Sequence, residues 1–186
     1  VSARADLTEG LALRGAIGTA FRAPSLQQQN FSAVQGALSA GQLVSVATLP
    51  VSDPIARALG AGDLRPERSR NYSAGIVLEP TPRLAFTLDA FHIQIDDRIA
   101  LSEQLRGAAV NAILAGAGIV GFSQVRFFTN AVDTRTTGVE ATARWSASLS
   151  PETRASMDVG FALYDTELES LRANPVLPTL PLLSLI

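Results

Sequence analysis

The single histidine is the first residue whose chemistry must be weighed. His92 is the only histidine of the 186-residue chain, and cysteine is absent. A zinc site uses several nitrogen or sulfur ligands, and no second one exists to join His92. The absence of cysteine also excludes disulfides, thiolate metal sites and cysteine catalysis. We therefore predict no metal and no cofactor, and we expect His92 to lie at an interface or in a hydrogen bond.

Two adjacent carboxylates, Asp96 and Asp97, could in principle bind calcium, which takes carboxylate oxygens as ligands. Neighbouring residues of a strand point to opposite faces, however, so this pair makes a poor chelate. No Ser-His-Asp order, glycine-rich phosphate loop or paired catalytic carboxylate is apparent. The sequence therefore predicts that the chain is not an enzyme and has no catalytic residue, and it assigns no ligand-binding residue.

Five other charged residues share one property, which is their place in alternating strands. They are Arg14, Asp89, Glu140, Arg144 and Asp158. In each strand the charge falls on the face opposite the apolar side chains, as the two-residue period of a strand allows. We expect these groups to form polar networks on one face of a sheet.

The central element that positions such charges is a hairpin within residues 64–99. Its expected strands, 70–79 and 84–97, are separated by a turn with two prolines, which cannot donate to a ladder. The residues expected on the apolar face are Tyr72, Ile76, Leu78, Phe86 and Leu88, joined by Val139 and Trp145 of a later strand. The residues expected on the polar face are Asn71, Ser73, Thr87 and Asp89, with Glu140 and Arg144. At Phe91 the apolar pattern changes phase, which predicts a bulge or the end of the buried zone.

The remaining pattern is a rhythm of strands and long connections. Strands are expected at 1–6, 11–22, 126–146 and 155–164. Short helices are expected at 52–60, where Asp53 can cap and Gly60 can end the helix, and at 102–116. Long connections cover about 23–66, 100–124 and 166–186. The six strands should pair in sequence order as an antiparallel meander.

Bulk properties exclude several classes of protein. The net charge is −2 and no basic run exists, which argues against a nucleic-acid partner. No apolar run approaches the ~18 to 20 residues of a membrane helix. Because Val1 is not an initiator methionine and no signal peptide is evident, we expect the sequence to begin within a longer protein.

The lengths of the connections distinguish a membrane barrel from a soluble β-sandwich, which the alternation of apolar and polar residues alone cannot do. The connections run short, long, short, long, which is typical of outer-membrane barrels with tight periplasmic turns and long external loops. A charge facing lipid at mid-bilayer would cost about 2 to 4 kcal/mol, which explains why charges gather on one face. In a soluble β-sandwich the same charges would face water, so that alternative stays open.

Four segments carry a family resemblance. They are Gly18–Leu26 (GTAFRAPSL), Leu64–Tyr72 (LRPERSRNY), Leu88–Ile99 (LDAFHIQIDDRI) and Asn130–Glu140, which contains Asn130-Ala131 and Gly138-Val139-Glu140. In this order they resemble the signature segments of TonB-dependent outer-membrane receptors, over about residues 7–165. The resemblance implies an all-β fold, part of a transmembrane up-and-down antiparallel β-barrel. This chain would supply an open curved sheet of about six strands, with long extracellular loops and short helices.

The resemblance also implies function and partners. Members of this family import siderophores, haem, cobalamin or glycans across the outer membrane, driven by TonB through an N-terminal plug domain. We therefore expect residues 1–186 to be part of such a barrel, without the plug, in contact with lipid, plug, TonB and a small ligand such as a ferric siderophore. The charged networks would brace barrel and plug. The alternatives are a non-energised outer-membrane barrel of porin or adhesin type, or a soluble β-sandwich binding module.

Overall fold

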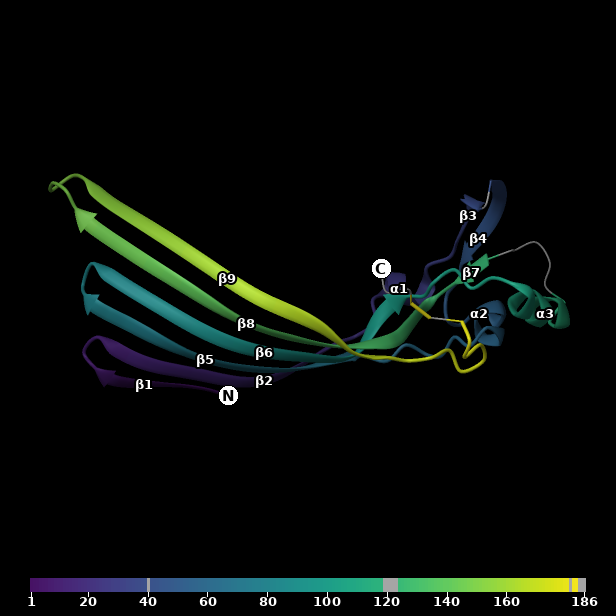
Figure 1. The fold of residues 1–186 in the computed structure, drawn as a ribbon, viewed down its shortest axis with the longest axis horizontal. Helices are drawn as coiled ribbons and strands as arrows, with labels where there is room; N and C mark the ends of the chain where they lie inside the picture. Colours follow the sequence, from purple (N-terminus) through teal and green to yellow (C-terminus); the bar gives the residue numbers. More distant parts are fainter. Residues whose placement is uncertain (40, 119–123, 181, 184–186) are drawn as a thin grey trace. The chain divides into compact units, whose positions relative to one another are not determined.

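The structure is a computed structural model that describes residues 1–39, 41–118, 124–180 and 182–183. Six strands form one open antiparallel sheet in the order β1-β2-β5-β6-β8-β9 (Figure 1). These strands are β1 (Ser2–Thr8), β2 (Leu11–Arg22), β5 (Glu67–Thr81), β6 (Leu84–Leu101), β8 (Phe128–Ser148) and β9 (Arg154–Leu171). The strand order confirms the predicted meander.

Tight turns join the strands at one end of each hairpin. β1 and β2 pair antiparallel with Ala3 opposite Gly15 and Ala5 opposite Leu13. The β8–β9 turn is closed by a hydrogen bond from the Leu149 N–H to the Thr153 carbonyl at 2.8 Å. Antiparallel strands need only such a reversal between them, which is why neighbours in the sheet are neighbours among these six strands.

Contacts between strands confirm the two predicted faces. Ile76, Leu78, Phe86 and Leu88 border one apolar depression. The Thr87 and Thr142 hydroxyls lie 2.6 Å apart on the other face. We call these the apolar face and the polar face of the six-stranded sheet. A slip of one residue would have exchanged them.

Of the two explanations for the phase change at Phe91, the bulge is wrong, because the register of β6 against β8 is the same at Thr87 and at His92. β6 continues past it to Leu101. Phe91 keeps the alternation and lies on the polar face against Gly138, where an added Cβ would stand only 2.6 Å from Phe91 Cζ. The unusual backbone in this strand is further on, at Asp97, whose φ is 57°.

A second, smaller sheet was not predicted. It contains β3 (Ala33–Ser39), β4 (Gln42–Thr48) and β7 (Gln124–Arg126) in the order β3-β4-β7. β3 and β4 form an antiparallel hairpin, whereas β4 and β7 pair in parallel, with Ala47 opposite Val125. The parallel pairing joins the first long connection to the second, so it depends on residues far apart in the sequence.

Three short helices lie in the long connections: α1 (Leu26–Asn30), α2 (Pro54–Ala58) and α3 (Ala108–Gly116). The α2 signals were correct, because the Asp53 side chain accepts from the Ile55 N–H at 2.8 Å and Gly60 has a φ of 98°. α3 starts six residues later than predicted. Leu105, expected in that helix, instead forms a bridge with Val125.

Two other boundaries differ from the sequence prediction. β9 reaches Leu171 through part of the segment predicted to be irregular, because Thr166 and Glu167 bond to Thr136 and Arg135 of β8. α1 was not predicted, although Ser25 and Gln28 form a capping box at its start. Residues 119–123 of the second predicted connection, and 181 and 184–186 of the third, lie outside the described residues.

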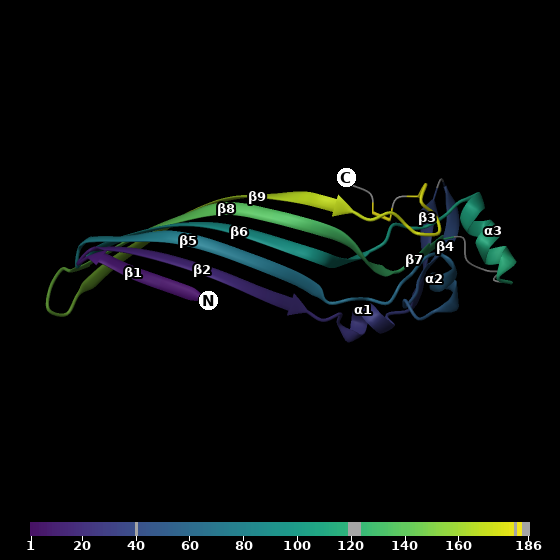
Figure 2. The ribbon, with the colours of Figure 1, turned by 90° about the horizontal axis from the view of Figure 1, so that it is seen from below.

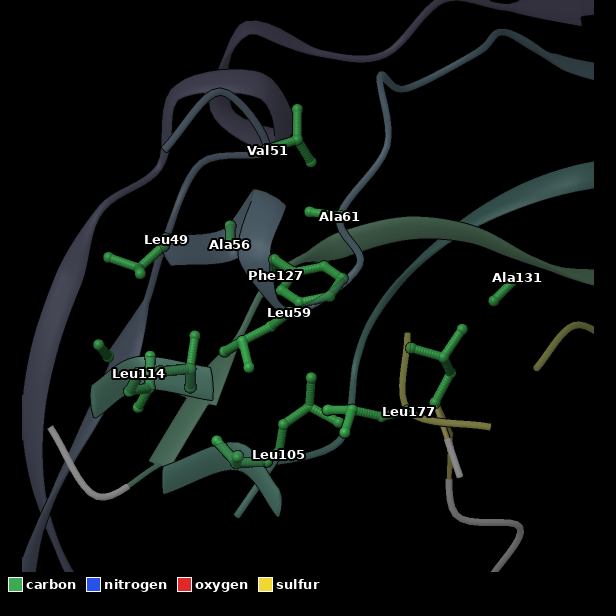
Figure 3. Close-up of a cluster of buried hydrophobic side chains, with 14 residues drawn as sticks. Leu49, Val51, Ala56, Leu59, Ala61, Leu105, Leu114, Phe127, Ala131 and Leu177 are labelled. Carbon is green, nitrogen blue, oxygen red and sulfur yellow. The ribbon is translucent and has the colours of Figure 1, made fainter. Parts of the chain in front are cut away.

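The main apolar core is built by the long connections (Figure 3). Its buried members are Ala47, Leu49, Val51, Ala56, Leu59, Ala61, Leu105, Val110, Leu114, Val125, Phe127, Ala131, Leu177 and Leu182. The buried Asn174 side chain ties the third connection to the first by donating to the Leu59 carbonyl at 2.9 Å. Its Oδ1 accepts from the N–H groups of Val176 and Leu177. We call this assembly the connection core.

The chain divides into two compact units. The first contains residues 1–20, 69–95 and 134–167 and consists of β-sheet. The second contains residues 21–68, 96–133 and 168–186 and includes the three short helices and the three-stranded sheet (Figure 2), together with the connection core. In the part of the chain that is described, no helix is long and apolar enough to cross a membrane.

Candidate functional site

On the polar face of the first unit, four of the five charged residues that were predicted to form networks form two separate ion pairs. Arg14 on β2 donates through Nε to Asp89 Oδ1 on β6 at 2.7 Å, and Arg144 on β8 donates through Nε to Asp158 on β9 at 2.6 Å. The Arg14–Asp89 pair crosses β5 at Gly75, where an added Cβ would lie 2.0 Å from Asp89 Oδ1. Glycine at position 75 therefore leaves the space through which the pair forms.

The second unit holds a denser polar cluster, and Glu67 is one of its two centres. The Glu67 side chain is only 9% exposed. It accepts from Arg22 Nε at 2.8 Å and from the Ile99 N–H at 2.8 Å, and a further bond joins it to the other end of the Arg22 guanidinium. Burial acts to raise the pKa of Glu67, but the Arg22 and Ile99 hydrogen bonds outweigh it, so the pKa lies below its ordinary value.

Asn130 is the second centre of the cluster, because its carboxamide forms hydrogen bonds with main-chain groups as the backbone of a neighbouring strand would. Its Oδ1 accepts from the Arg65 N–H at 2.7 Å, and its Nδ2 donates to the Arg65 carbonyl at 2.9 Å. The same Nδ2 donates to the Asp97 carbonyl at 2.6 Å. One carboxamide thus satisfies three main-chain groups on two separate segments, which would otherwise need ladder partners or water.

Asp97 has the left-handed backbone that non-glycine residues seldom adopt, and its neighbours hold it there. Its N–H donates to Asp133 Oδ1 at 2.7 Å. Its carboxylate accepts from Arg65 at 2.8 Å and also from Arg172. Together with Asn130, which donates to the Asp97 carbonyl, these three residues hold Asp97 in its strained conformation.

Asp133 closes the cluster on the side of β9. It accepts from the Ser170 hydroxyl at 2.6 Å, and Arg172 Nη2 lies 3.6 Å from its Oδ1. Burial acts to raise the pKa of Asp133, but the hydrogen bonds from Ser170 and Asp97 and the positive charge of Arg172 bring the pKa below its ordinary value. The pKa of Arg172 is raised chiefly by its hydrogen bond to Asp97.

These residues, which we call the motif cluster, lie at the bases of all three long connections. The motif cluster consists of Arg22, Arg65, Glu67, Asp97, Ile99, Asn130, Asp133, Ser170 and Arg172. Arg22 and Arg65 flank the first connection, Ile99 and Asn130 flank the second, and Arg172 begins the third. The geometry suits the cluster to hold the connections in place.

The charge balance shows what the motif cluster can do chemically. Three arginines, Arg22, Arg65 and Arg172, contact three carboxylates, Glu67, Asp97 and Asp133. A charge-balanced group with its carboxylates already bonded offers no excess charge to attract an anionic ligand. Within the described ranges, no group of three His, Cys, Asp or Glu side chains gathers as a metal site would require. The contacts of the cluster instead join residues at the bases of the three long connections to one another.

Comparison with protein families decides the identity of this fold. The profile of the family "TonB dependent receptor-like, beta-barrel" matches residues 1–181. The chain belongs to the TonB-dependent receptor family. None of the curated protein sequences matches it significantly.

Solved structures of siderophore receptors share the fold of this TonB-dependent receptor segment. The siderophore receptor PirA from Pseudomonas aeruginosa is 17% identical, with 90% of this chain and 28% of that chain covered at a TM-score of 0.57. A mutant of the ferric enterobactin receptor PfeA from Pseudomonas aeruginosa, in complex with enterobactin, is 21% identical. The match covers 87% of this chain and 21% of that chain at a TM-score of 0.58. The siderophore receptor PirA from Acinetobacter baumannii is 17% identical, and the match covers 86% of this chain and 22% of that chain at a TM-score of 0.52. The chain thus spans about a quarter of each receptor, and the likeness establishes the fold.

The motif cluster brings together residues from the four segments that carry the resemblance to TonB-dependent receptors. Arg22 comes from the FRAP segment, Arg65 and Glu67 from LRPE, Asp97 from DDRI and Asn130 from the Asn-Ala pair. The sequence identified these motifs but not that they meet. Asp133, Ser170 and Arg172 carried no sequence signal. The pairing of β6 with β8 brings Asp133 to Asp97, and the pairing of β8 with β9 brings Ser170 and Arg172 to them.

The structure also places three residues that the sequence analysis considered one by one: His92, Asp97 and Glu140. His92 is in a hydrogen bond, with Nδ1 3.0 Å from the Thr137 hydroxyl oxygen, and its ring centroid lies 6.2 Å from that of Tyr72 on the apolar face. Asp97, weighed as half of a calcium chelate, is bonded to arginines instead. Glu140 is exposed on β8.

Proposed function

We propose that this chain is part of the β-barrel of a TonB-dependent active transporter in the outer membrane of a Gram-negative bacterium. The transporter imports a scarce nutrient, such as a ferric siderophore, and has no enzymatic activity. Family membership supports energised transport over a porin or an adhesin. Within the described residues the apolar face of the six-stranded sheet is exposed, whereas a sandwich would bury it against another sheet, and this argues against the soluble sandwich.

The observation that carries this proposal is the motif cluster. A receptor that captures a rare ligand needs its long connections held in a defined arrangement, since ordering them on binding would cost conformational entropy. The cluster ties the bases of all three, and the connection core packs them against one another. We infer that these connections are extracellular and take part in ligand capture.

The partners follow from the same proposal. The apolar face of the first unit contacts membrane lipid. The polar face, with Arg14–Asp89 and Arg144–Asp158, faces the lumen and the plug domain of the full-length receptor. TonB acts through that plug.

The test is uptake by cells that express the full-length receptor as their only ferric-siderophore transporter. A panel of radiolabelled ferric siderophores that includes ferric enterobactin serves as the probe, in strains with and without TonB. We expect uptake of at least one probe in the strain with TonB and only background uptake without it. Equal uptake in both strains would assign the chain to a non-energised barrel.

A further inference from the structure

We propose that β6 sets the register of the six-stranded sheet by placing two successive side chains of its polar face over two glycines. Asp89 lies over Gly75 of β5, and Phe91 lies over Gly138 of β8. This inference concerns the assembly of the sheet and goes beyond the proposed transport function.

Two of the five strand pairings in the six-stranded sheet have no tight turn to set their register. β2 and β5 are joined by residues 23–66, and β6 and β8 by residues 102–127. The turn of a hairpin fixes which residues face one another, whereas connections of this length do not. A slip of one residue would exchange the two faces, so the apolar pattern opposes it. A slip of two residues keeps the faces and must be prevented in another way.

Phe91 and Gly138 supply that constraint between β6 and β8. The side-chain contacts between these two strands set Phe91 opposite Gly138. A Cβ added at Gly138 would lie 2.6 Å from Phe91 Cζ and 2.8 Å from Tyr164 Cβ. Gly138 is buried, although Thr137 and Val139 on either side of it are exposed. The Phe91 ring therefore occupies the space that a side chain at position 138 would take.

Asp89 and Gly75 provide the corresponding constraint between β2 and β5. A Cβ added at Gly75 would overlap Asp89 Oδ1, and Gly75 is also buried between two exposed neighbours. Across this glycine the Asp89 carboxylate accepts from Arg14 Nε of β2 at 2.7 Å. The two-residue turn between β5 and β6 fixes Asp89 relative to β5, so its ion pair with Arg14 fixes β2 relative to both strands.

Each of the two glycine strands offers one such position. β5 and β8, which are described over their whole lengths, contain a single glycine each. A two-residue slip would set Phe91 opposite Thr136 or Glu140, whose side chains would stand where the ring lies. Asp89 would likewise face a residue that carries a side chain. The native register is thus the one in which both side chains of β6 meet a glycine.

Disulfide formation in the full-length receptor measures the register of β6 against β8. Residues 1–186 contain no cysteine, and any cysteine elsewhere in the receptor is first replaced by serine. Thr87→Cys with Thr142→Cys reports the native register, because the two hydroxyls lie 2.6 Å apart. Thr87→Cys with Glu140→Cys or with Arg144→Cys reports a two-residue slip in either direction, since diagonal neighbours are too far apart for a disulfide. The yields are compared by non-reducing electrophoresis of receptor oxidised in membranes.

Two variants disturb the contact, and each has a matched control. Phe91→Ala removes the ring and Gly138→Ala fills its place. Phe86→Ala makes the first change on the apolar face of β6, and Gly160→Ala makes the second on the polar face of β9, where an added Cβ would meet nothing within 4 Å. We expect the ratio of slipped to native disulfide to rise about tenfold in Phe91→Ala and Gly138→Ala, and to keep its wild-type value in both controls.

A further variant separates the two glycine contacts. Asp89→Ala should leave this ratio unchanged, because it acts on the pairing of β2 with β5. A wild-type ratio in Phe91→Ala would overturn the proposal, and so would an equal rise in the two controls. If Gly138→Ala is degraded before insertion, Phe91→Ala carries the test, since it removes atoms and introduces no clash. The measurement requires no transport, so its failure would leave the proposed function intact.

Discussion

Asn130 and Arg65 are joined through both main-chain groups of Arg65: the Asn130 carboxamide accepts from its N–H at 2.7 Å and donates to its carbonyl at 2.9 Å. This is the pairing that a neighbouring strand would normally provide. Because Asn130 follows the second connection and Arg65 ends the first, one side chain joins the bases of two connections. Arg172, which donates to the Asn130 carbonyl at 3.1 Å, adds the third.

The motif cluster should loosen in acid. The pKa values of Glu67 and Asp133 in the folded protein lie below the ordinary values of 4.5 and 3.8. Ionisation of these two carboxylates therefore stabilises the folded second unit. Their contribution to stability is complete above about pH 5 and is lost as the pH falls below those ordinary values and through the lowered pKa values. Limited proteolysis of the full-length receptor from pH 7 to 3 should show cleavage in the connections rising below pH 5.

The matched variant for this acid effect is Glu67→Gln, which cannot titrate. It should be cleaved more readily than wild type at pH 7 and should show a smaller rise on acidification. An identical pH profile for wild type and Glu67→Gln would assign the acid sensitivity to other carboxylates.

Gly75 should control the Arg14–Asp89 pair. In Gly75→Ala the new methyl group would lie 2.0 Å from Asp89 Oδ1, closer than two non-bonded atoms can approach, so the carboxylate must rotate away from Arg14. The pair is partly exposed and contributes at most about 1 kcal/mol, so we expect a destabilisation of that order. Reversible folding into lipid bilayers measures it.

A double-mutant cycle provides the control for this prediction. Asp89→Asn should destabilise the wild-type receptor but have little further effect in the Gly75→Ala background. Fully additive effects would show that Gly75 does not act through Asp89.

Substitution by arginine should destabilise the barrel much more at Leu88 than at Thr87. Leu88→Arg places a charge on the apolar face and should lower barrel stability by about 2 to 4 kcal/mol if the site lies near mid-bilayer. Thr87→Arg places it on the polar face, beside Thr142, and should cost much less. Folding into bilayers at several urea concentrations would measure both. Equal costs would mean that Leu88 does not face hydrocarbon.

The connection core should depend on Asn174. Asn174→Ala leaves the Leu59 carbonyl and the N–H groups of Val176 and Leu177 without their buried partner, which costs about 1 to 3 kcal/mol. Hydrogen exchange should then accelerate at residues 56–61 and 174–177 together. Asn111→Ala, at an exposed position on α3, is the control and should leave exchange unchanged.

The first unit could be predicted from the sequence, and much of the second could not. Alternation fixed the faces of Ile76, Leu88 and Asp89, because a strand has only two faces. The α2 helix was predictable because Asp53 and Gly60 are local signals. β7 is three residues long and pairs in parallel with a strand some 80 positions earlier, so no local pattern identifies it.

The motif cluster lies between these extremes. Its motif residues were recognisable by family resemblance, yet Asp97 was assessed with its neighbour Asp96, and its real partners lie 32 and 75 positions away. Side-chain bonds to distant backbone, such as those of Asn130, have no sequence period. They depend on the completed sheet.

The central claim is that one cluster holds all three connections, and hydrogen exchange of the full-length receptor with Asn130→Ala tests it most directly. Peptides covering residues 49–66, 99–106, 124–132 and 171–177 should be compared between wild type, Asn130→Ala and the control Asn111→Ala. The account predicts faster exchange in all four regions in Asn130→Ala and none in the control. Faster exchange confined to Arg65 and its immediate neighbours would contradict it.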